Sequence, residues 1–174
     1  GVGAQEYQIR LGFSNFGFRL YDSSSGGSIT KNLTNALNTS QWYHLVCTYD
    51  GQGSTSGMKI YVDGSIPSIG DSTGGTYTAM ENTAGDFTIG LVDNQYFEGN
   101  IDEVSIFNIE LSAAEVLAIY NAGSPGDLTT HTGLIGWWRM GDSGGFPIIN
   151  DNSSQANNGT MTNMVAADIE NFIP

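Results

Sequence analysis

The sequence predicts an all-β fold, a two-sheet antiparallel sandwich with one short helix. Short runs of alternating apolar and polar residues recur along the chain, and Gly, Asn, Asp or Ser bounds each run, as is typical of such sandwiches. Glycine provides 24 of the 174 residues, which favours turns over long helices. The single cysteine, Cys47, excludes an intrachain disulfide and a zinc site built on cysteines.

Six segments of the N-terminal two thirds alternate in the way that strands do. The clearest is 58–62, where Met58, Ile60 and Val62 share one face. A stretch rich in Gly and Ser, 50–57, separates it from the apolar run 42–50, so these two strands should form an antiparallel hairpin. The other predicted strands are 7–13, 16–21, 87–92 and 101–107.

One short helix is predicted near 112–122. Ser112 is a good N-cap, Glu115 completes a capping box with it, and Gly123 provides the C-terminal stop. The apolar residues that we expect on its packed face are Ala113, Val116, Leu117 and Tyr120.

A linker rich in turn formers, 124–133, separates a first domain, 1–123, from a C-terminal segment, 134–174. The segment carries predicted strands at 134–140, 148–149 and 159–163, and about forty residues are marginal as an independent domain. We therefore expect it to dock on the sandwich or to begin a second module. Strand exchange with a neighbouring copy, giving a homo-oligomer, is the alternative route to the same packing.

Charge excludes two classes of partner. The formal net charge is −13, from 5 Lys and Arg against 18 Asp and Glu. Five scattered basic residues cannot neutralise a run of phosphates, so we expect no nucleic-acid partner and no anionic membrane surface. No apolar run approaches the roughly 20 residues of a membrane helix, so we expect no membrane insertion.

The sequence offers only weak matches to known catalytic motifs. Gly141–Gly145 reads Gly-Asp-Ser-Gly-Gly, as around the nucleophile of trypsin-like proteases, but the two histidines, His44 and His131, lie in an apolar strand and in the linker. Asp102 and Glu103 are adjacent and point to opposite faces of a strand, which does not suit a glycosidase pair. We expect no enzyme activity, and His44 and Cys47 are interpreted as strand packing.

The order of five segments resembles a known family. The segments that resemble laminin G-like domains of the concanavalin A-like lectin/glucanase jelly-roll superfamily are Trp42–Val46, Thr48–Gly51, Ile60–Gly64, Phe87–Gly90 and Phe97–Asn108, followed by Leu111-Ser112 and Glu115. The resemblance covers about 7–123 and implies a jelly-roll sandwich whose opening strands look truncated. Residues 134–142 look like such opening strands.

The resemblance also implies a structural calcium ion at the sandwich rim. Asp102 and Asp151 are the residues carried over as its ligands, because they occur in segments expected to meet. Calcium prefers oxygen ligands from carboxylates, amides and carbonyls, which the Gly-rich loops offer. The alternative is that these acids are solvated or accept backbone N–H groups.

Exposed aromatic residues are the candidates for ligand binding. Trp138 and Tyr96 could stack on a sugar ring, although Trp137 and Trp138 point to opposite faces of a strand, so that at least one belongs to the core. For the Trp pair we favour core or interface.

Two functions from different classes follow. The C-terminal stretches 137–142 and 158–164 also resemble structural proteins of marine bacteriophages. We therefore expect a non-enzymatic recognition or assembly module, a surface adhesion or structural protein of a virion or other extracellular assembly, located outside the cell or on the virion surface. The alternative is a carbohydrate-binding module of a larger secreted enzyme. The expected partners are a glycan or other subunits of the same assembly.

Overall fold

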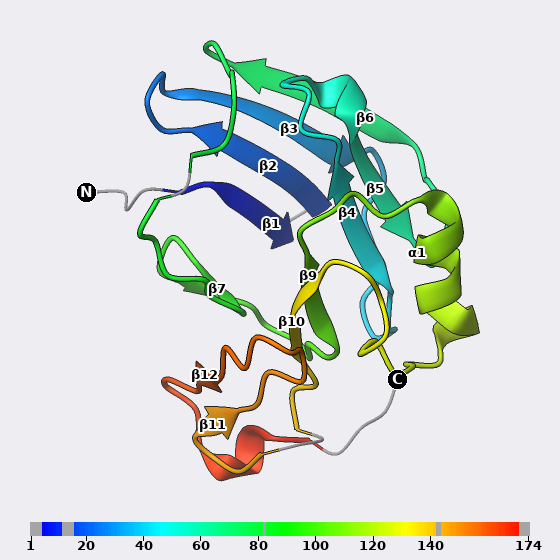
Figure 1. Cartoon of the computed structure of the whole chain (residues 1–174), viewed down its shortest axis with the longest axis vertical. Helices are drawn as coiled ribbons and strands as arrows, with labels where there is room; N and C mark the ends of the chain where they lie inside the picture. The colour runs from blue at the N-terminus through cyan, green and yellow to red at the C-terminus, as the bar shows by residue number, and fades with distance from the viewer. Residues whose placement is uncertain (1–4, 12–15, 82, 142–143, 171–174) are drawn as a thin grey trace. The chain divides into compact units, whose positions relative to one another are not determined.

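The fold is known from a computed structural model, which describes residues 5–11, 16–81, 83–141 and 144–170 (Figure 1). The chain divides into two compact units, with the boundary between Phe97 and Glu98. Residues 98–123, which the sequence had assigned to the first domain, group with the C-terminal segment in unit 2.

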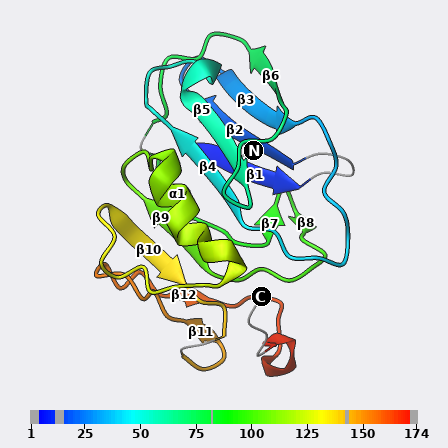
Figure 2. The same ribbon diagram turned by 90° about the vertical axis from the view of Figure 1, so that its right-hand side faces the viewer.

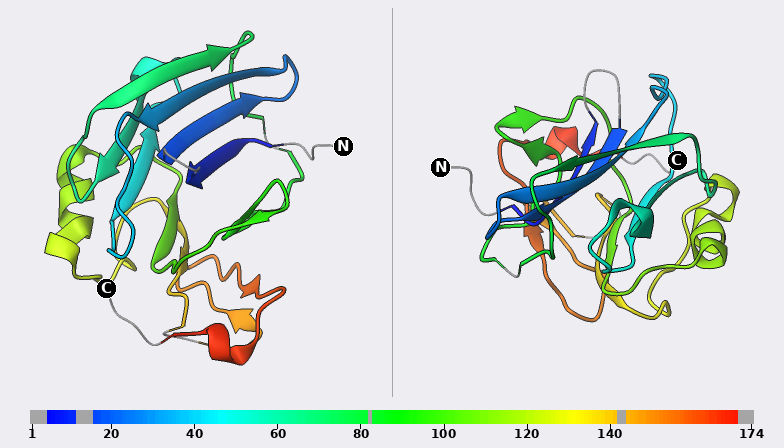
Figure 3. Two further views of the ribbon diagram at one scale, coloured as in Figure 1. Left: turned by 180° about the vertical axis from the view of Figure 1, so that it is seen from behind. Right: turned by 90° about the horizontal axis from the view of Figure 1, so that it is seen from above.

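Unit 1 is built on a four-stranded antiparallel sheet with the strand order β1-β2-β3-β6 (Figures 1 and 3). The strands are β1 (Tyr7–Leu11), β2 (Phe16–Asp22), β3 (Gly27–Leu33) and β6 (Ile69–Gly74). β1 is an edge strand of this sheet, because β2 is its one neighbour among the described residues.

Alternation gives the sheet one apolar and one polar face. In β2, Phe16, Phe18 and Leu20 are buried, while Gly17 and Arg19 between them point the other way. β3 repeats the pattern, with Ile29 and Leu33 buried in the core, and its alternate residues on the polar face are Ser28, Thr30 and Asn32.

A β-hairpin covers the apolar face. β4 (Leu45–Tyr49) and β5 (Met58–Val62) pair antiparallel with Cys47 opposite Ile60, which confirms the predicted hairpin. The connection includes a short 3₁₀ helix, η1 (Thr55–Gly57). One buried cluster holds the two layers together, and its members are Phe16, Phe18, Leu20, Ile29, Leu33, Met58 and Ile60. Each such side chain contributes about 1.5–3 kcal/mol by its burial.

Two strands of this sheet, β3 and β6, were not predicted. Several predicted strands were too long, since 42–50 forms only as Leu45–Tyr49 and 101–107 only as Val104–Phe107. Of the expected strand 87–92, only β7 (Leu91–Val92) forms, and it pairs with β8 (Gln95–Tyr96). The described residues thus form one four-stranded sheet and four two-stranded pairs. The fold is mostly β with one short α-helix, as expected, but the described strands do not join into two continuous sheets.

Unit 2 pairs a strand from each side of the predicted linker (Figure 2). β9 (Val104–Phe107) runs antiparallel to β10 (Leu134–Trp138), with an irregularity between Leu134 and Gly136. The start of the C-terminal segment is therefore tied to the predicted strand 101–107 within its own chain. A second pair joins β11 (Ile148–Ile149) to β12 (Gly159–Thr160), and the 3₁₀ helices of this unit are η2 (Asn121–Gly123) and η3 (Ala166–Asp168).

Helix α1 (Ala113–Tyr120) begins as predicted. The Ser112 hydroxyl accepts a hydrogen bond from the Glu115 N–H, and the Glu115 carboxylate accepts from the Ser112 N–H, which is a capping box. Asn121, with a φ of 43°, ends the helix in the left-handed conformation.

The expected packed face of α1 was partly wrong. Val116 is fully buried and Ile119 and Tyr120 are half-buried, whereas Leu117 is 56% exposed and Ala113 is also exposed. The reason is geometric, because Ile119 and Tyr120 lie one turn from Val116, while Leu117 is rotated by about 100° from it.

Candidate functional site

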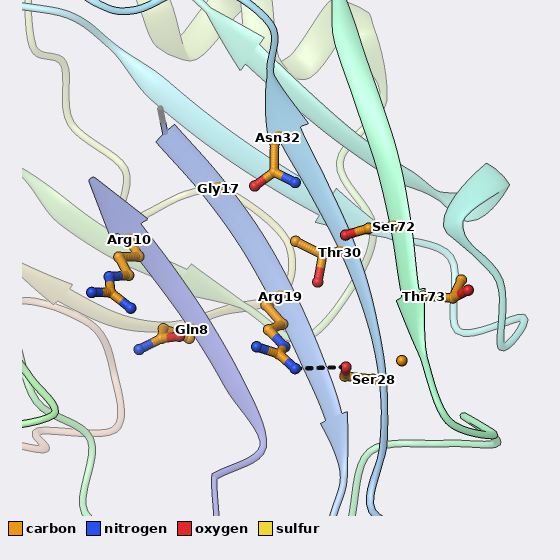
Figure 4. Close-up of a pocket in the computed structure, with 10 residues that line it drawn as sticks. Gln8, Arg10, Gly17, Arg19, Ser28, Thr30, Asn32, Ser72 and Thr73 are labelled. Atoms are coloured by element: carbon orange, nitrogen blue, oxygen red, sulfur yellow. Dashed lines mark hydrogen bonds between the residues drawn. The ribbon is translucent and has the colours of Figure 1, made fainter. Parts of the chain in front are cut away.

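A groove of about 350 Å³ lies on the polar face of the unit 1 sheet (Figure 4). We call it the sheet groove. All four strands contribute to it, and the polar side chains that line it include Gln8, Arg10, Arg19, Ser28, Thr30, Asn32 and Ser72. Volumes of this size are within the range of small-molecule sites.

Strand register arranges these residues in rows across the sheet. In one row Gln8 lies opposite Arg19, Arg19 opposite Thr30, and Thr30 opposite Ser72. In the next row Arg10 lies opposite Gly17, and Gly17 opposite Asn32. Directly opposite residues of an antiparallel pair point to the same face, so both rows line the groove.

Gly17 leaves a gap in the second row. A Cβ atom at this position would lie 2.6 Å from the Asn32 Oδ1 atom, which is too close for a non-bonded contact. The absence of a side chain therefore makes room for the Asn32 amide, which lies over Gly17.

Arg19 is held in place by two contacts. Its Nη2 donates a hydrogen bond to the Ser28 Oγ atom at 2.9 Å, and its guanidinium lies 4.7 Å from the centre of the Tyr21 ring. A cation over an aromatic face is stabilised by the ring quadrupole. These contacts fix the guanidinium plane and leave most of its five N–H donors available.

Gln8 presents an unsatisfied donor in the groove. Its Oε1 accepts a hydrogen bond from the Tyr21 hydroxyl at 3.0 Å, but its Nε2 is buried and has no hydrogen-bond partner among the described residues. A buried donor without a partner costs about 1–3 kcal/mol. A bound acceptor, from water or from a ligand, would remove this cost.

Both groove arginines lack a carboxylate partner within the described part of the chain. Arg10 donates from Nη2 to the Gln95 Oε1 atom at 3.1 Å, which is a neutral acceptor. None of the described residues that line the groove is acidic, although the chain has 18 acidic residues. The groove is therefore a local basic site on an acidic protein.

A different polar centre lies around Asp151 in unit 2. The Asp151 Oδ1 accepts from the N–H groups of Trp137 and Ser153, both at 2.8 Å. Its Oδ2 accepts from the Asn157 N–H at 2.8 Å and the Ser153 hydroxyl at 2.9 Å. Burial acts to raise the pKa of this carboxyl, but the hydrogen bonds outweigh it and the pKa is lowered.

In this arrangement the Asp151 carboxylate accepts hydrogen bonds from the protein itself, which is the alternative to calcium binding stated above. Each of its carboxylate oxygens already accepts two hydrogen bonds, which uses the lone pairs that a cation would need. Asp102 accepts one hydrogen bond from the Glu103 N–H at 2.8 Å. No group of three or more His, Cys, Asp or Glu suited to a metal occurs within the described ranges. Calcium binding at Asp102 and Asp151 stays a prediction.

Glu103 joins β9 to β10. Its Oε2 accepts from the Trp137 Nε1 at 2.7 Å and its Oε1 from the Arg139 Nε at 2.9 Å. The Arg139 guanidinium lies 5.3 Å from the Trp137 ring centre. The carboxylate thus closes a structural network and offers no pair of acids for catalysis.

The two predicted aromatic ligand residues lie in different settings. Trp138 is 7% exposed and its Nε1 donates to the Asn157 carbonyl at 3.0 Å, which does not fit a platform for stacking a sugar. Trp137 is also buried, so both members of the pair belong to the core of unit 2. Tyr96 is 60% exposed and follows Gln95, the partner of Arg10.

In the protease-like turn, Asp142 and Ser143 lie outside the described residues. Burial raises the pKa of the Cys47 thiol, which holds it neutral. Together with its place in the cross-strand pair with Ile60, this agrees with a packing role.

Sequence reasoning missed the sheet groove because it missed β3 and β6. Residues 27–33 carry only a weak signal, since Lys31 interrupts the apolar face that Ile29 and Leu33 begin. Residues 69–74 contain one apolar residue, Ile69, and give no periodic pattern. The arginines looked scattered along the chain, but the β1–β2 hairpin brings Arg10 and Arg19 to one face.

The chain was compared with solved structures, curated proteins and protein families. A crystal structure of an S-layer domain-containing protein from Clostridium thermocellum ATCC 27405 is similar at 18% identity with a TM-score of 0.38, and the match covers 66% of this chain and 63% of that chain. No curated protein matches, and neither the structural match nor the family match supports a bacteriophage origin. Among the described residues, every helix is too short or too polar to span a bilayer.

The family model described as the concanavalin A-like lectin/glucanases superfamily, of the laminin G type, matches residues 1–117. This range includes all four strands of the sheet groove and the hairpin behind them. The chain therefore belongs to the concanavalin A-like lectin/glucanase superfamily.

Proposed function

We propose that this chain is a non-enzymatic recognition module that binds carbohydrate in the sheet groove. Laminin G-like domains of this superfamily are generally binding modules. The observation that carries the proposal is the lining of the groove, where guanidinium, amide and hydroxyl groups converge and the Gln8 Nε2 donor is buried without a partner among the described residues.

The lining suits the chemistry of a sugar. A sugar hydroxyl both donates and accepts a hydrogen bond, and the groove offers donors from Arg10, Arg19 and Gln8 and mixed groups from Thr30 and Asn32. Polar groups at such a site discriminate strongly, because a ligand that lacks the matching group leaves them unpaired. A ligand rich in hydroxyls is thus favoured over an apolar one.

The same lining supports a role without catalysis. Glycoside hydrolysis generally needs two carboxyl groups, one as acid and one as nucleophile or base. No acidic side chain is among the described residues of the groove. Binding therefore accounts for the groove better than hydrolysis does.

A glycan array followed by titration calorimetry tests the proposal. We expect the full chain to bind a defined class of glycan, and Asn32→Ala to weaken that binding by about tenfold through loss of one or two hydrogen bonds. Asn35→Ala is the control, since Asn35 is an exposed amide outside the groove. If no glycan binds, or if both variants behave alike, the proposal is wrong.

A second candidate, an assembly module, is favoured by the edge strand β1. Tyr7, Ile9 and Leu11 alternate along this strand and are 40%, 53% and 47% exposed. An edge with apolar side chains invites pairing with another strand. The module would then act as an adhesion or structural subunit of a virion or other extracellular assembly, with strand exchange as one route.

Light scattering after size exclusion separates this candidate from the first. A homo-oligomer that Ile9→Lys converts to monomer would support assembly through β1. A monomer at all concentrations would remove the second candidate and leave the first unaffected. Both candidates place the chain at an extracellular or other exposed surface, where glycans and such assemblies occur.

A further inference from the structure

We infer that the sheet groove selects a saccharide that carries a carboxylate, a uronic-acid residue. The inference rests on the proposed carbohydrate binding and adds the charge and orientation of the ligand. It is carried by three donors over β1 and β2, Gln8, Arg10 and Arg19, and by the neutral lining over β3 and β6.

The groove concentrates positive charge. Two of the 5 basic residues of the chain lie in this one groove. Within the described residues neither Arg10 nor Arg19 contacts a carboxylate, and their recorded polar partners, Gln95 and Ser28, are neutral. At physiological salt the charge of distant acids is screened beyond about 8 Å. An anion inside the groove therefore meets mainly the two guanidinium groups.

The geometry of β1 and β2 is the second step. Gln8 is directly opposite Arg19 in the register, and Arg10 is two residues from Gln8 on the same face of β1. Figure 4 shows Arg19 over β2, whereas Gln8 and Arg10 extend from β1 on the side away from β2. Diagonal neighbours across an antiparallel pair have backbone positions about 7–8 Å apart, a spacing that a saccharide lying across β1 and β2 can bridge.

Preorganisation of Arg19 is the third step. The hydrogen bond to Ser28 and the Tyr21 ring beneath the guanidinium hold its plane before any ligand arrives. A fixed guanidinium fork matches the two oxygens of a planar carboxylate through parallel hydrogen bonds.

The other half of the groove requires more than an anion. Thr30 and Ser72 continue the row of Arg19, and Asn32 continues the row of Arg10. These hydroxyl and amide groups match sugar hydroxyls and carry no charge. A simple anion would leave them unused, and a neutral sugar would leave the arginines unused. A uronic acid, which has both kinds of group on one ring, uses both halves.

Titration calorimetry on the full chain tests the inference with matched ligands. The probes are tetra-galacturonate and tetra-mannuronate, their fully methyl-esterified forms, and a sulfated galactose tetrasaccharide. We expect one of the two uronates to bind about tenfold or more tightly than its own methyl ester, because the ester removes the negative charge and keeps the hydroxyls.

Variants assign the effect to the arginines. Arg19→Ala should remove the preference for the acid over the ester, and Arg19→Lys should restore part of that preference. Lys59→Gln is the control, since it changes the net charge by the same amount on a strand outside the groove. If the Arg19 variants melt at a lower temperature than the unsubstituted chain, the preference for acid over ester is measured in Arg10→Ala instead.

The outcomes are distinct. Equal affinity for acid and ester would overturn the inference and leave the proposed carbohydrate binding intact. Tighter binding of the sulfated probe than of either uronate would overturn the assignment of a carboxylate. Silence of all five probes and of a glycan array would overturn the inference and the proposed function together.

Discussion

Two arginines lie over aromatic rings in this chain, one in each unit, and they are used differently. Arg139 lies over Trp137 and donates to Glu103, and the Trp137 Nε1 donates to the same carboxylate, so charge and donors are matched inside unit 2. Arg19 lies over Tyr21 and donates to the neutral Ser28. An arginine over an aromatic ring thus has a structural role where a carboxylate also binds it. Where no carboxylate binds it, the guanidinium is available to a ligand.

The largest expected effect is a loss of stability in unit 2, where the polar groups are matched within the protein. Asp151→Ala removes the acceptor of three backbone N–H groups, from Trp137, Ser153 and Asn157. Leaving buried donors unsatisfied should lower the free energy of unfolding by about 3 kcal/mol or more. Urea denaturation measures this change.

The control for this variant is Asp127→Ala. Asp127 is exposed and accepts hydrogen bonds from the N–H and the hydroxyl of Thr129. Its loss should cost about 1 kcal/mol or less. Equal destabilisation by the two substitutions would show that the Asp151 network does not hold unit 2 together.

The next effect contrasts the two arginines directly. Arg139→Ala deprives the half-buried Glu103 of its ion pair and should cost about 1 kcal/mol after allowance for solvent screening. Arg19→Ala should change the free energy of unfolding by about 0.5 kcal/mol or less, because Arg19 is exposed and its partner is neutral. Thermal and urea denaturation of both variants checks the order, and a greater loss for Arg19 would reverse our assignment of roles.

Acid should weaken both units through their buried aspartates. Hydrogen bonds from the Thr78 and Ser25 N–H groups and from the Ser24 hydroxyl lower the pKa of Asp22 in unit 1, and the pKa of Asp151 is lowered in unit 2. A carboxyl whose pKa is depressed on folding stabilises the protein above its ordinary value, 3.8 for Asp, and loses that contribution as the pH falls toward the folded value.

The urea midpoint should therefore be flat from about pH 7 to 5 and fall steadily below about pH 4. Asp22→Asn should flatten part of this fall, since its side chain no longer titrates. An unchanged acid limb in Asp22→Asn would mean that other carboxyls control the acid sensitivity.

The smallest expected effect is that of calcium. Because the Asp151 oxygens already accept four hydrogen bonds, calcium in excess over chelator should shift the Tm by about 1 °C or less. A larger rise that disappears in Asp102→Ala would instead support the calcium site expected from the family resemblance.

The sequence predicted the elements whose signals are local. The capping residues Ser112 and Glu115 and the alternation of 58–62 lead directly to α1 and β5. β6 could not be found in this way, because Ile69–Gly74 is held by pairing with β3 and has no apolar face of its own. The buried state of Trp138 depends on partners such as Asn157, which are distant along the chain.

The candidate site was harder to predict than the fold for the same reason. Arg10 and Arg19 become neighbours through a hairpin, and Thr30, Asn32 and Ser72 join them through two strands without a clear pattern. A binding face made of short polar side chains has no periodic hydrophobic signal. The register of four strands, rather than any motif, assembles it.

The gap at Gly17 has an evolutionary consequence. Because a Cβ atom there would meet the Asn32 Oδ1 at 2.6 Å on the polar face, away from the core, a mutation to alanine would displace the Asn32 amide from its place in the groove and leave the apolar packing untouched. A lineage could thus lose its ligand by a single codon change and keep a folded domain. The residue at this one position would then divide homologous chains into those under selection for binding and those retained for their scaffold.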